Sequence, residues 1–189
     1  MENINTYFKL AMFIPVGITL FISIIITPYL KLGNYKIVCN DKGKIVYNKN
    51  DFAWPTPGAT GISSYFGKRK TPTKGASTFH KGVDILAAQG TTVYAMASGK
   101  VVVAGYTSSG GYMVKIEHAN DYTSSYCHLS ENLYVKVNGY VSKGQPIGTV
   151  GPKYLSNGKL NGATTGVHLH FAISRAGEAI DPLKLVRKK

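Results

Sequence analysis

Cysteine is scarce in this chain of 189 residues, which contains only Cys39 and Cys127 and no CxxC pair. Two cysteines so far apart exclude a disulfide-framework protein and a thiolate zinc finger. A single bridge between them is the remaining alternative. We expect no bridge, because Cys127 falls within a predicted strand and Cys39 precedes the domain to which that strand belongs.

Acidic residues are also few, with 9 Asp and Glu against 22 Lys and Arg, for a formal charge of +13. From Lys31 onward there are 21 basic and 8 acidic residues, so the part after the first thirty residues carries the whole excess. Such a surface attracts acidic partners over long range, an attraction that salt weakens. Nucleic acid, anionic lipid and anionic cell-wall polymers all qualify. The alternative is that the charge only keeps the domain soluble.

Several catalytic and binding motifs are absent. The sequence has no HExxH, no GxSxG and no GxxxxGK[ST], which excludes the zincin helix with its glutamate base, the nucleophile elbow and the phosphate loop. A zinc knuckle, a cold-shock stacking motif and a basic helix are missing too, so we expect no nucleic-acid partner. Anionic wall polymers or lipid head groups explain the positive charge equally well.

Long amphipathic helical patterns are missing after residue 30, and short β-like runs alternate with glycine turns instead. With 21 glycines and 13 tyrosines in the chain, this pattern predicts an all-β domain, a small antiparallel barrel or sandwich-like fold, over residues 53–189. The weak helical candidate is the terminal segment DPLKLVRKK. The clearest strand candidates are residues 91–97, 100–106, 112–119, 122–129 and 168–174.

One long apolar run is present near the N-terminus. The 21 residues from Leu10 to Leu30 carry no charged side chain, and a helix of that length spans about 30 Å, the thickness of the hydrocarbon core of a bilayer. We therefore predict that residues 1–30 form a membrane anchor with one transmembrane helix. A cleaved signal peptide is the alternative, disfavoured because the following TPYLKL is a poor cleavage site.

Residues 31–52 are predicted to be a linker with a short β-hairpin at residues 36–50, formed by KIVCN, a DKG turn and KIVYN. Four lysines follow the apolar run (Lys31, Lys36, Lys42 and Lys44), whereas Lys9 alone precedes it. This charge bias predicts a cytoplasmic C-terminal side. The chemistry described below requires the opposite orientation, and the conflict stays open.

His80 and Asp84, in HKGVD, are both acceptable zinc ligands. Gly82 and Val83 argue against a helix between them, so we place this pair on a loop that enters a strand. By itself the spacing is weak, because chance pairs of this kind are common.

His168 and His170 flank Leu169 in VHLHFAI. Side chains alternate along a strand, so the two imidazoles point to one face and can bind one metal or place a ligand beside a proton-transfer group. An isolated HxH pair is equally compatible with two surface histidines.

His128 ends the run YTSSYCHL, and a lone histidine there is usually structural. His118, in KIEHAN, is predicted to be part of the scaffold.

Taken in order, five runs of this sequence resemble one family: ISSYFGKR, FHKGVDILAAQGTTVYAMASGKVV, GGYMVKIEHANDYTSSYCHLS, VSKGQPIGTVG and TTGVHLHFAI. They are similar to the lysostaphin-type (LytM-like) zinc metallopeptidases, which cut peptide cross-links in peptidoglycan. The resemblance covers residues 54–185. Residues 152–163 lengthen a loop that is usually shorter in this family.

The resemblance implies that His80, Asp84 and His170 bind Zn2+ and that His128 and His168 are catalytic. In the implied mechanism, zinc polarises the scissile carbonyl and activates a water. One histidine helps to deprotonate that water, and the other stabilises the oxyanion or protonates the leaving amine. Which histidine has which role is left open.

The expected function is therefore that of a membrane-anchored zinc endopeptidase acting on the stem peptides and cross-bridges of peptidoglycan. Its peptidase domain would face the wall, in the periplasm or at the cell exterior, or the anchor would lie in the membrane of a phage virion. One alternative is a catalytically inactive LytM-like module that activates another wall hydrolase, disfavoured because all five site positions are retained. A biotinyl- or lipoyl-type carrier domain is a further alternative, suggested by ASGKVVVAG and NGYVSKGQPIGTVG, but no lysine occupies the required turn.

Overall fold

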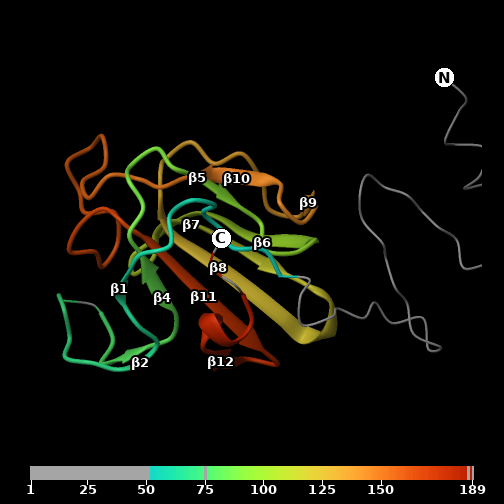
Figure 1. Ribbon diagram of the computed structural model, residues 1–189. Coiled ribbons are helices and arrows are strands. Elements are labelled where there is room, and N and C mark those ends of the chain that lie inside the picture. Colours follow the sequence, from blue (N-terminus) through green and yellow to red (C-terminus); the bar gives the residue numbers. More distant parts are fainter. Residues whose placement is uncertain (1–51, 75, 187, 189) are drawn as a thin grey trace, which may run out of the picture. The chain divides into compact units, whose positions relative to one another are not determined.

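The computed structural model describes residues 52–74, 76–186 and 188 (Figure 1). The predicted membrane helix at residues 10–30, the predicted hairpin at residues 36–50 and Cys39 lie outside these residues. Within the described part, no helix has both the length and the apolar character needed to cross a membrane. Cys127 is a free, buried thiol there.

Short strands and tight turns make up the described chain, which confirms the prediction of an all-β, antiparallel domain. The terminal helical candidate is realised as a single 3-10 turn, η2, capped by Asp181, whose carboxylate accepts the Leu183 N–H. The elements are β1 (Ile62–Ser64), β2 (Gly67–Lys68), β3 (Phe79–His80), β4 (Val83–Ile85), β5 (Thr92–Tyr94), β6 (Gly99–Thr107), β7 (Gly111–Glu117), η1 (Ala119–Asp121), β8 (Tyr122–Leu129), β9 (Tyr140–Val141), β10 (Pro146–Thr149), β11 (Leu169–Arg175), β12 (Glu178–Ile180) and η2 (Pro182–Lys184).

One large antiparallel sheet dominates the fold, with the strand order β1-β4-β11-β8-β7-β6-β9 and with β12 paired to the end of β11. Two small ladders, β10-β5 and β2-β3, complete the described strands. Figure 1 shows the long strands β6, β7, β8 and β11 side by side. Successive hairpins explain the β6-β7-β8 part, whereas β11 inserts between β8 and β4, strands far from it in sequence.

The hydrophobic core gathers buried side chains from the large sheet and from the β5-β10 ladder. Alternation along β11 buries Leu169, Phe171 and Ile173 completely, as expected for side chains two residues apart in a strand. The Phe171 ring lies 5.4 Å from the Tyr126 ring and 6.4 Å from the Trp54 ring, measured between centroids. These aromatic contacts fix the strand that carries His170.

The other face of the large sheet carries polar side chains in register. On β4, Asp84 pairs with Ser64 of β1 and with His170 of β11, and His170 pairs in turn with Cys127 of β8. Directly opposed residues project to the same face of a sheet with Cβ atoms about 5 Å apart. Strand pairing therefore gathers one row of functional groups from four separate segments.

Glycine is required at position 82, in the short connection between β3 and β4. A Cβ atom on Gly82 would lie 2.4 Å from the carbonyl oxygen of Phe171, much closer than atoms can approach. Only glycine lets this connection pass directly over β11. The close passage brings His80 back beside Asp84.

Replacing Phe171 with Ala is predicted to lower the free energy of unfolding by about 3–5 kcal/mol, because it leaves a cavity between Trp54 and Tyr126. Urea unfolding followed by fluorescence measures the loss. The matched control is Phe79→Ala, which removes the same atoms from a side chain that is 39% exposed. Equal losses for the two variants would contradict the assigned core.

Candidate metal centre and its histidines

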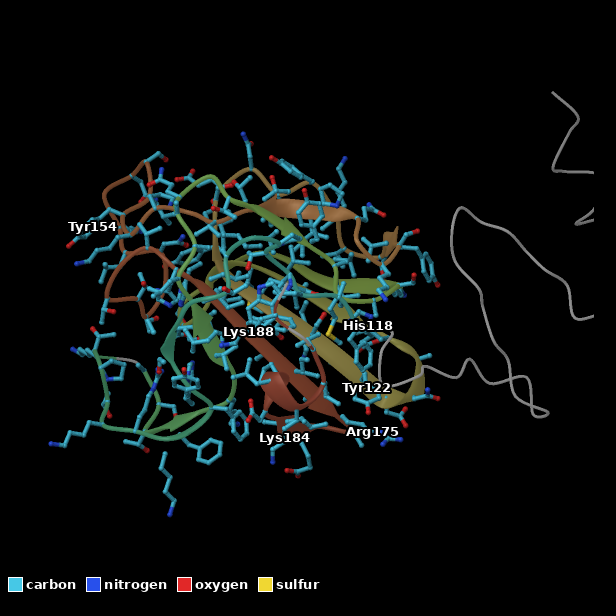
Figure 2. All side chains as sticks on the ribbon, viewed as in Figure 1. His118, Tyr122, Tyr154, Arg175, Lys184 and Lys188 are labelled. Carbon is cyan, nitrogen blue, oxygen red and sulfur yellow. The ribbon has the colours of Figure 1, made fainter. Side chains whose placement is uncertain are left out.

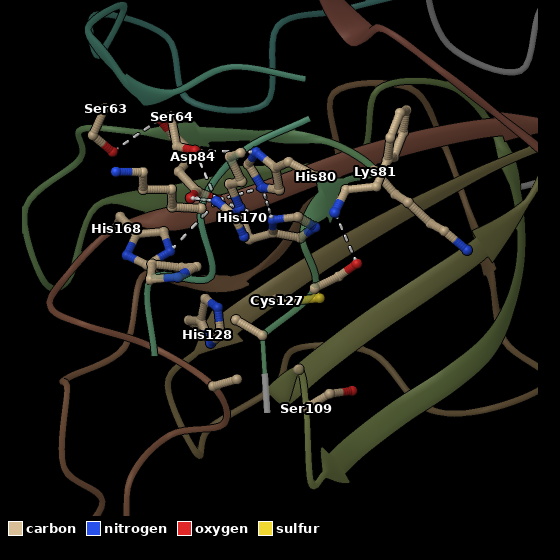
Figure 3. A pocket seen from close by; sticks show the side chains of 18 residues that line it. Ser63, Ser64, His80, Lys81, Asp84, Ser109, Cys127, His128, His168 and His170 are labelled. Carbon is tan, nitrogen blue, oxygen red and sulfur yellow. Dashed lines mark hydrogen bonds and ion pairs between the residues drawn. The ribbon is translucent and has the colours of Figure 1, made fainter. Parts of the chain in front are cut away.

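Three side chains from three strands converge on one point. Asp84 Oδ1 lies 2.9 Å from Nδ1 of His170 and 3.1 Å from Nε2 of His80, and these two nitrogens are 2.9 Å apart. The prediction placed His80 on a loop; it lies instead at the end of the two-residue strand β3. Figure 3 shows the three side chains pointing toward one another.

This triangle fits a zinc ion. Ligand atoms about 2.0–2.1 Å from one tetrahedral ion are roughly 3.3 Å apart, close to the separations here. Two imidazoles and one carboxylate also form a donor set that zinc accepts, and catalytic zinc sites commonly use three protein ligands. The cluster of His80, Asp84 and His170 could therefore hold one metal ion.

Backbone geometry selects the tautomer of His80. Its Nδ1 lies 2.9 Å from the carbonyl oxygen of Tyr65, and a carbonyl can only accept a hydrogen bond. Nδ1 must therefore carry the proton, which leaves the lone pair on Nε2, the nitrogen that faces Asp84 and His170. Orientation of a ligand imidazole by a carbonyl behind it is common in metal sites.

His128 and His168 stand beside the triangle. Their ring centroids are 4.8 Å apart, and Nε2 of His168 lies 3.6 Å from Oδ1 of Asp84. Each ring points Nδ1 at a backbone carbonyl, that of Asn161 at 2.7 Å for His128 and that of Gly166 at 3.0 Å for His168. Nδ1–H donates in both cases, so Nε2 is free in both neutral rings to accept a proton.

A β-bulge re-aims His128. The register between β7 and β8 shifts between Tyr112 and Val114, and His128 has a φ of 62°. In a regular strand, Cys127 and His128 would point to opposite faces, whereas here both line the same cleft. A left-handed conformation in a non-glycine residue costs about 1–3 kcal/mol and is often found at functional sites.

Asn161 positions His128, a role that the sequence did not predict. Its side chain is fully buried; its Oδ1 accepts the Tyr112 N–H at 2.9 Å, and its Nδ2 donates to the Leu129 carbonyl at 2.9 Å. It thus ties the long loop at residues 152–163 to β7 and β8, and its own carbonyl orients His128. An asparagine within a polar loop gives no sequence signal for this role.

The charges in the cluster follow from burial and contacts. Burial by itself raises the pKa of Asp84, but the close contacts with His170 and His80 outweigh it and hold this pKa well below its usual range. Burial, followed by repulsion from the His168 ring, lowers the pKa of His128 to about 4. Burial also lowers the pKa of His168, although the Asp84 carboxylate opposes this. Asp84 is thus ionised and both His128 and His168 are neutral at pH 7.

The cluster lies in a cleft of about 520 Å3. Three of the lining side chains are cationic, namely Arg69, Lys70 and Lys81, and Asp84 is the one acidic residue among the described residues that line it. The β1–β3 region, Ala163 and His168 all contribute lining residues. Figure 3 shows His128 and His168 beside the three ligand candidates.

His118 does not line this cleft. Figure 2 shows its side chain near that of Tyr122, at the start of β8. The ring of His118 is buried, with Nδ1 2.9 Å from the Ser98 carbonyl and Nε2 2.8 Å from the Ser124 hydroxyl. Burial lowers the pKa of His118, against the effect of the Ser98 carbonyl. Both ring nitrogens are engaged within the fold, in agreement with the predicted scaffold role.

An all-β domain with a His2Asp cluster and two further histidines defines a zinc-peptidase type of site. The model of peptidase family M23 matches residues 78–182, and this chain belongs to that family. Peptidases of the family are zinc-dependent.

Two curated relatives show the range of the family. The DD-carboxypeptidase/endopeptidase Mpg of Neisseria meningitidis serogroup B is 34% identical over 146 residues, covering 77% of this chain and 32% of Mpg. The murein hydrolase activator NlpD of Escherichia coli is 33% identical over 138 residues, covering 72% of this chain and 31% of NlpD. The chain thus spans about a third of the length of these relatives.

Two solved structures are similar in fold. A zinc-containing peptidase from Vibrio cholerae matches with a TM-score of 0.58 and 31% identity, covering 73% of this chain and 39% of that one. The catalytic domain of lysostaphin from Staphylococcus simulans matches with a TM-score of 0.55 and 33% identity, covering 66% of this chain and 90% of that one.

Zinc content distinguishes the three ligand candidates from the neighbouring histidines. His170→Gln is predicted to weaken zinc binding by more than about 100-fold, since even residues behind a ligand contribute 10–100-fold. The matched variant His168→Gln is predicted to retain one zinc per chain by elemental analysis after dialysis. Equal zinc loss in both variants would contradict the assignment.

His118 is predicted to make stability pH-dependent. Its lowered pKa means that the unfolded chain binds a proton more readily, so stability is complete above the unfolded pKa near 6.5 and falls as the pH drops below it. In urea unfolding with a chelator present, His118→Gln should lose less stability than the wild type between pH 7.5 and 5.5. The difference is at most about 1.4 kcal/mol per pH unit, and identical losses would contradict it.

Proposed function

We propose that this chain is a zinc endopeptidase that hydrolyses peptide cross-links of bacterial peptidoglycan. The observation that carries the proposal is the arrangement of His80, Asp84 and His170 around one point, with the free Nε2 atoms of His128 and His168 beside it. A set of metal ligands with two adjacent proton acceptors matches what hydrolysis of an amide bond requires.

The chemistry divides between the metal and the protein. Bound zinc supplies a Lewis acid that polarises the scissile carbonyl and makes water more acidic. The pKa of about 4 keeps His128 unprotonated at neutral pH, which is the state needed to accept a proton. Of the two histidines, one takes the proton of the attacking water at Nε2, and the other stabilises the oxyanion or protonates the leaving amine once its own Nε2 has taken up a proton. Both are anchored through Nδ1, so their Nε2 atoms can exchange protons without the rings moving.

The cleft suits a substrate that carries negative charge. Lys70 and Lys81 line it as cations, whereas the Arg69 cation is paired with the single carboxylate, that of Asp84. Stem peptides of peptidoglycan bear free carboxylates, whereas a purely glycine bridge bears none along its length. Electrostatic attraction to the cationic rim would therefore favour the stem peptide as the segment bound in the cleft.

The proposed location is the wall-facing side of a membrane, with the apolar run at residues 10–30 as the anchor. Peptidoglycan is the substrate of such a site only where the domain faces the wall. The positive charge after the anchor would add attraction to anionic wall polymers or lipid head groups. A bacterial envelope and the membrane of a phage virion would both place the domain correctly.

A second candidate function is that of a module that activates another wall hydrolase without cutting peptides itself. The similarity to NlpD, which is named a murein hydrolase activator, favours this alternative. The four histidines and the aspartate of the site are all retained and lie close together, which favours the endopeptidase function. The two functions differ in whether the purified chain digests the wall without a partner.

The full-length chain, purified in mild detergent and loaded with zinc, is predicted to release soluble fragments from purified peptidoglycan. A chelator should abolish the release and added zinc should restore it. The variant His128→Asn, whose asparagine tolerates the left-handed backbone, should bind zinc normally but digest at least about 100-fold more slowly. Dye release from labelled peptidoglycan measures the rate.

Two outcomes would contradict the proposal that this chain is an endopeptidase. In one, the zinc-loaded wild type releases nothing by itself but increases the digestion caused by a separate wall hydrolase. That result would establish the activator function. In the other, His128→Asn digests as fast as the wild type, which would remove that histidine from the mechanism.

A further inference from the structure

Arg69 lies beside the metal cluster and contacts the carboxylate of Asp84. Its Nη1 is 3.3 Å from Oδ2 of Asp84 and 2.7 Å from the hydroxyl oxygen of Ser64. That hydroxyl oxygen is in turn 3.2 Å from Nδ1 of His80. The Arg69 guanidinium and the Ser64 hydroxyl therefore link Asp84 and His80, two of the three ligand candidates.

Strand pairing holds this arrangement in place. Ser64 is directly opposite Asp84 in the β1–β4 pair, so the two side chains project to the same face. The Arg69 N–H donates to the carbonyl of Thr78 at 2.8 Å, which continues the β2–β3 ladder next to His80. The side chain of Arg69 is mostly buried, and its position is fixed by two strand pairs rather than by a flexible surface contact.

The two oxygens of Asp84 have different partners. Oδ1 faces the imidazole nitrogens of His80 and His170, while Oδ2 accepts from Arg69. A carboxylate can bind a metal through one oxygen or through both. A hydrogen bond from a guanidinium to one oxygen leaves the other as the available ligand.

The position of Arg69 is energetically unfavourable in one respect. Its Nε–H is buried and has no hydrogen-bond partner in the part of the chain that the structure describes. An unsatisfied buried donor destabilises a fold and calls for an explanation. A group kept in such a place is better explained by a role toward Asp84 than by its own contribution to stability.

We infer that Arg69, with Ser64, is a positioning residue that restricts Asp84 to one metal-binding oxygen. This inference rests on the proposed zinc-dependent function. Catalytic zinc sites keep one position free for water or substrate, and a second oxygen from Asp84 would compete for that position. Arg69 thus acts on the rate of hydrolysis through Asp84, without contact with the reacting atoms.

The test uses the full-length chain and the variants Arg69→Met, Arg69→Lys and Ser64→Ala, with Lys68→Met as the matched control. Lys68 is an exposed cation next to Arg69 in the sequence, and it does not line the cleft. Each protein is loaded with zinc for metal analysis and peptidoglycan digestion, and with Co2+ for absorption spectroscopy. The spectrum reports coordination, because four-coordinate Co2+ absorbs far more strongly than five- or six-coordinate Co2+.

Arg69→Met is expected to keep one metal per chain, to lower kcat at least 10-fold with KM changed less than 3-fold, and to weaken the Co2+ absorption. Arg69→Lys should recover most of kcat and of the absorption, since an ammonium can still reach Oδ2. Ser64→Ala should shift both readouts in the same direction by a smaller factor. The Lys68→Met protein should match the wild type.

Retention of the wild-type spectrum and kcat by Arg69→Met would overturn the inference, as would loss of zinc in parallel with activity. If Arg69→Met does not fold, as judged by circular dichroism, Ser64→Ala decides: a wild-type kcat and a wild-type Co2+ spectrum in that variant overturn the inference. Failure of the proposed function is a separate result, in which the wild-type zinc form leaves peptidoglycan intact. Metal content and the Co2+ spectra still test the inference in that case.

Discussion

The pairing of β11 with β4 is the constraint on which the site depends. It sets His170 directly opposite Asp84, and a slip of β11 by one residue would turn His170 toward the core. The register is held from behind, where Leu169, Phe171 and Ile173 are buried on the opposite face of the same strand. The alternation that packs the core therefore also orients the ligands.

Three other backbone features complete the site around this pair. Gly82 allows the close passage over β11 that returns His80 to Asp84. The bulge at His128 turns that ring out of the strand alternation and toward the cleft. The loop that contains Asn161 then orients His128 through a carbonyl. Rigid strand pairing supplies the ligands, and irregular backbone supplies the proton-transfer group, a division of roles common at catalytic sites.

Much of this could be predicted from the sequence, because alternation and glycine turns carry the signal for an all-β fold, and HxH on a strand predicts two imidazoles on one face. The strands around residues 100–106, 112–119, 122–129 and 168–174 were predicted for that reason. The bulge at His128 could not be predicted, because no residue pattern marks the register shift and the carbonyl that orients the ring belongs to the distant Asn161. Neither could the roles of Asn161 and Arg69, which act through single hydrogen bonds to groups brought near by the fold. The membrane anchor at residues 10–30 remains a prediction from its length and apolar character.

The central claim is that the cleft hydrolyses a peptide bond in peptidoglycan with the help of zinc. Mass spectrometry of the fragments released from purified peptidoglycan by the zinc-loaded chain tests it most directly. The account predicts new amino termini within the stem peptides or cross-bridges, with the glycan strands intact. New reducing sugar ends, with every peptide bond intact, would contradict it.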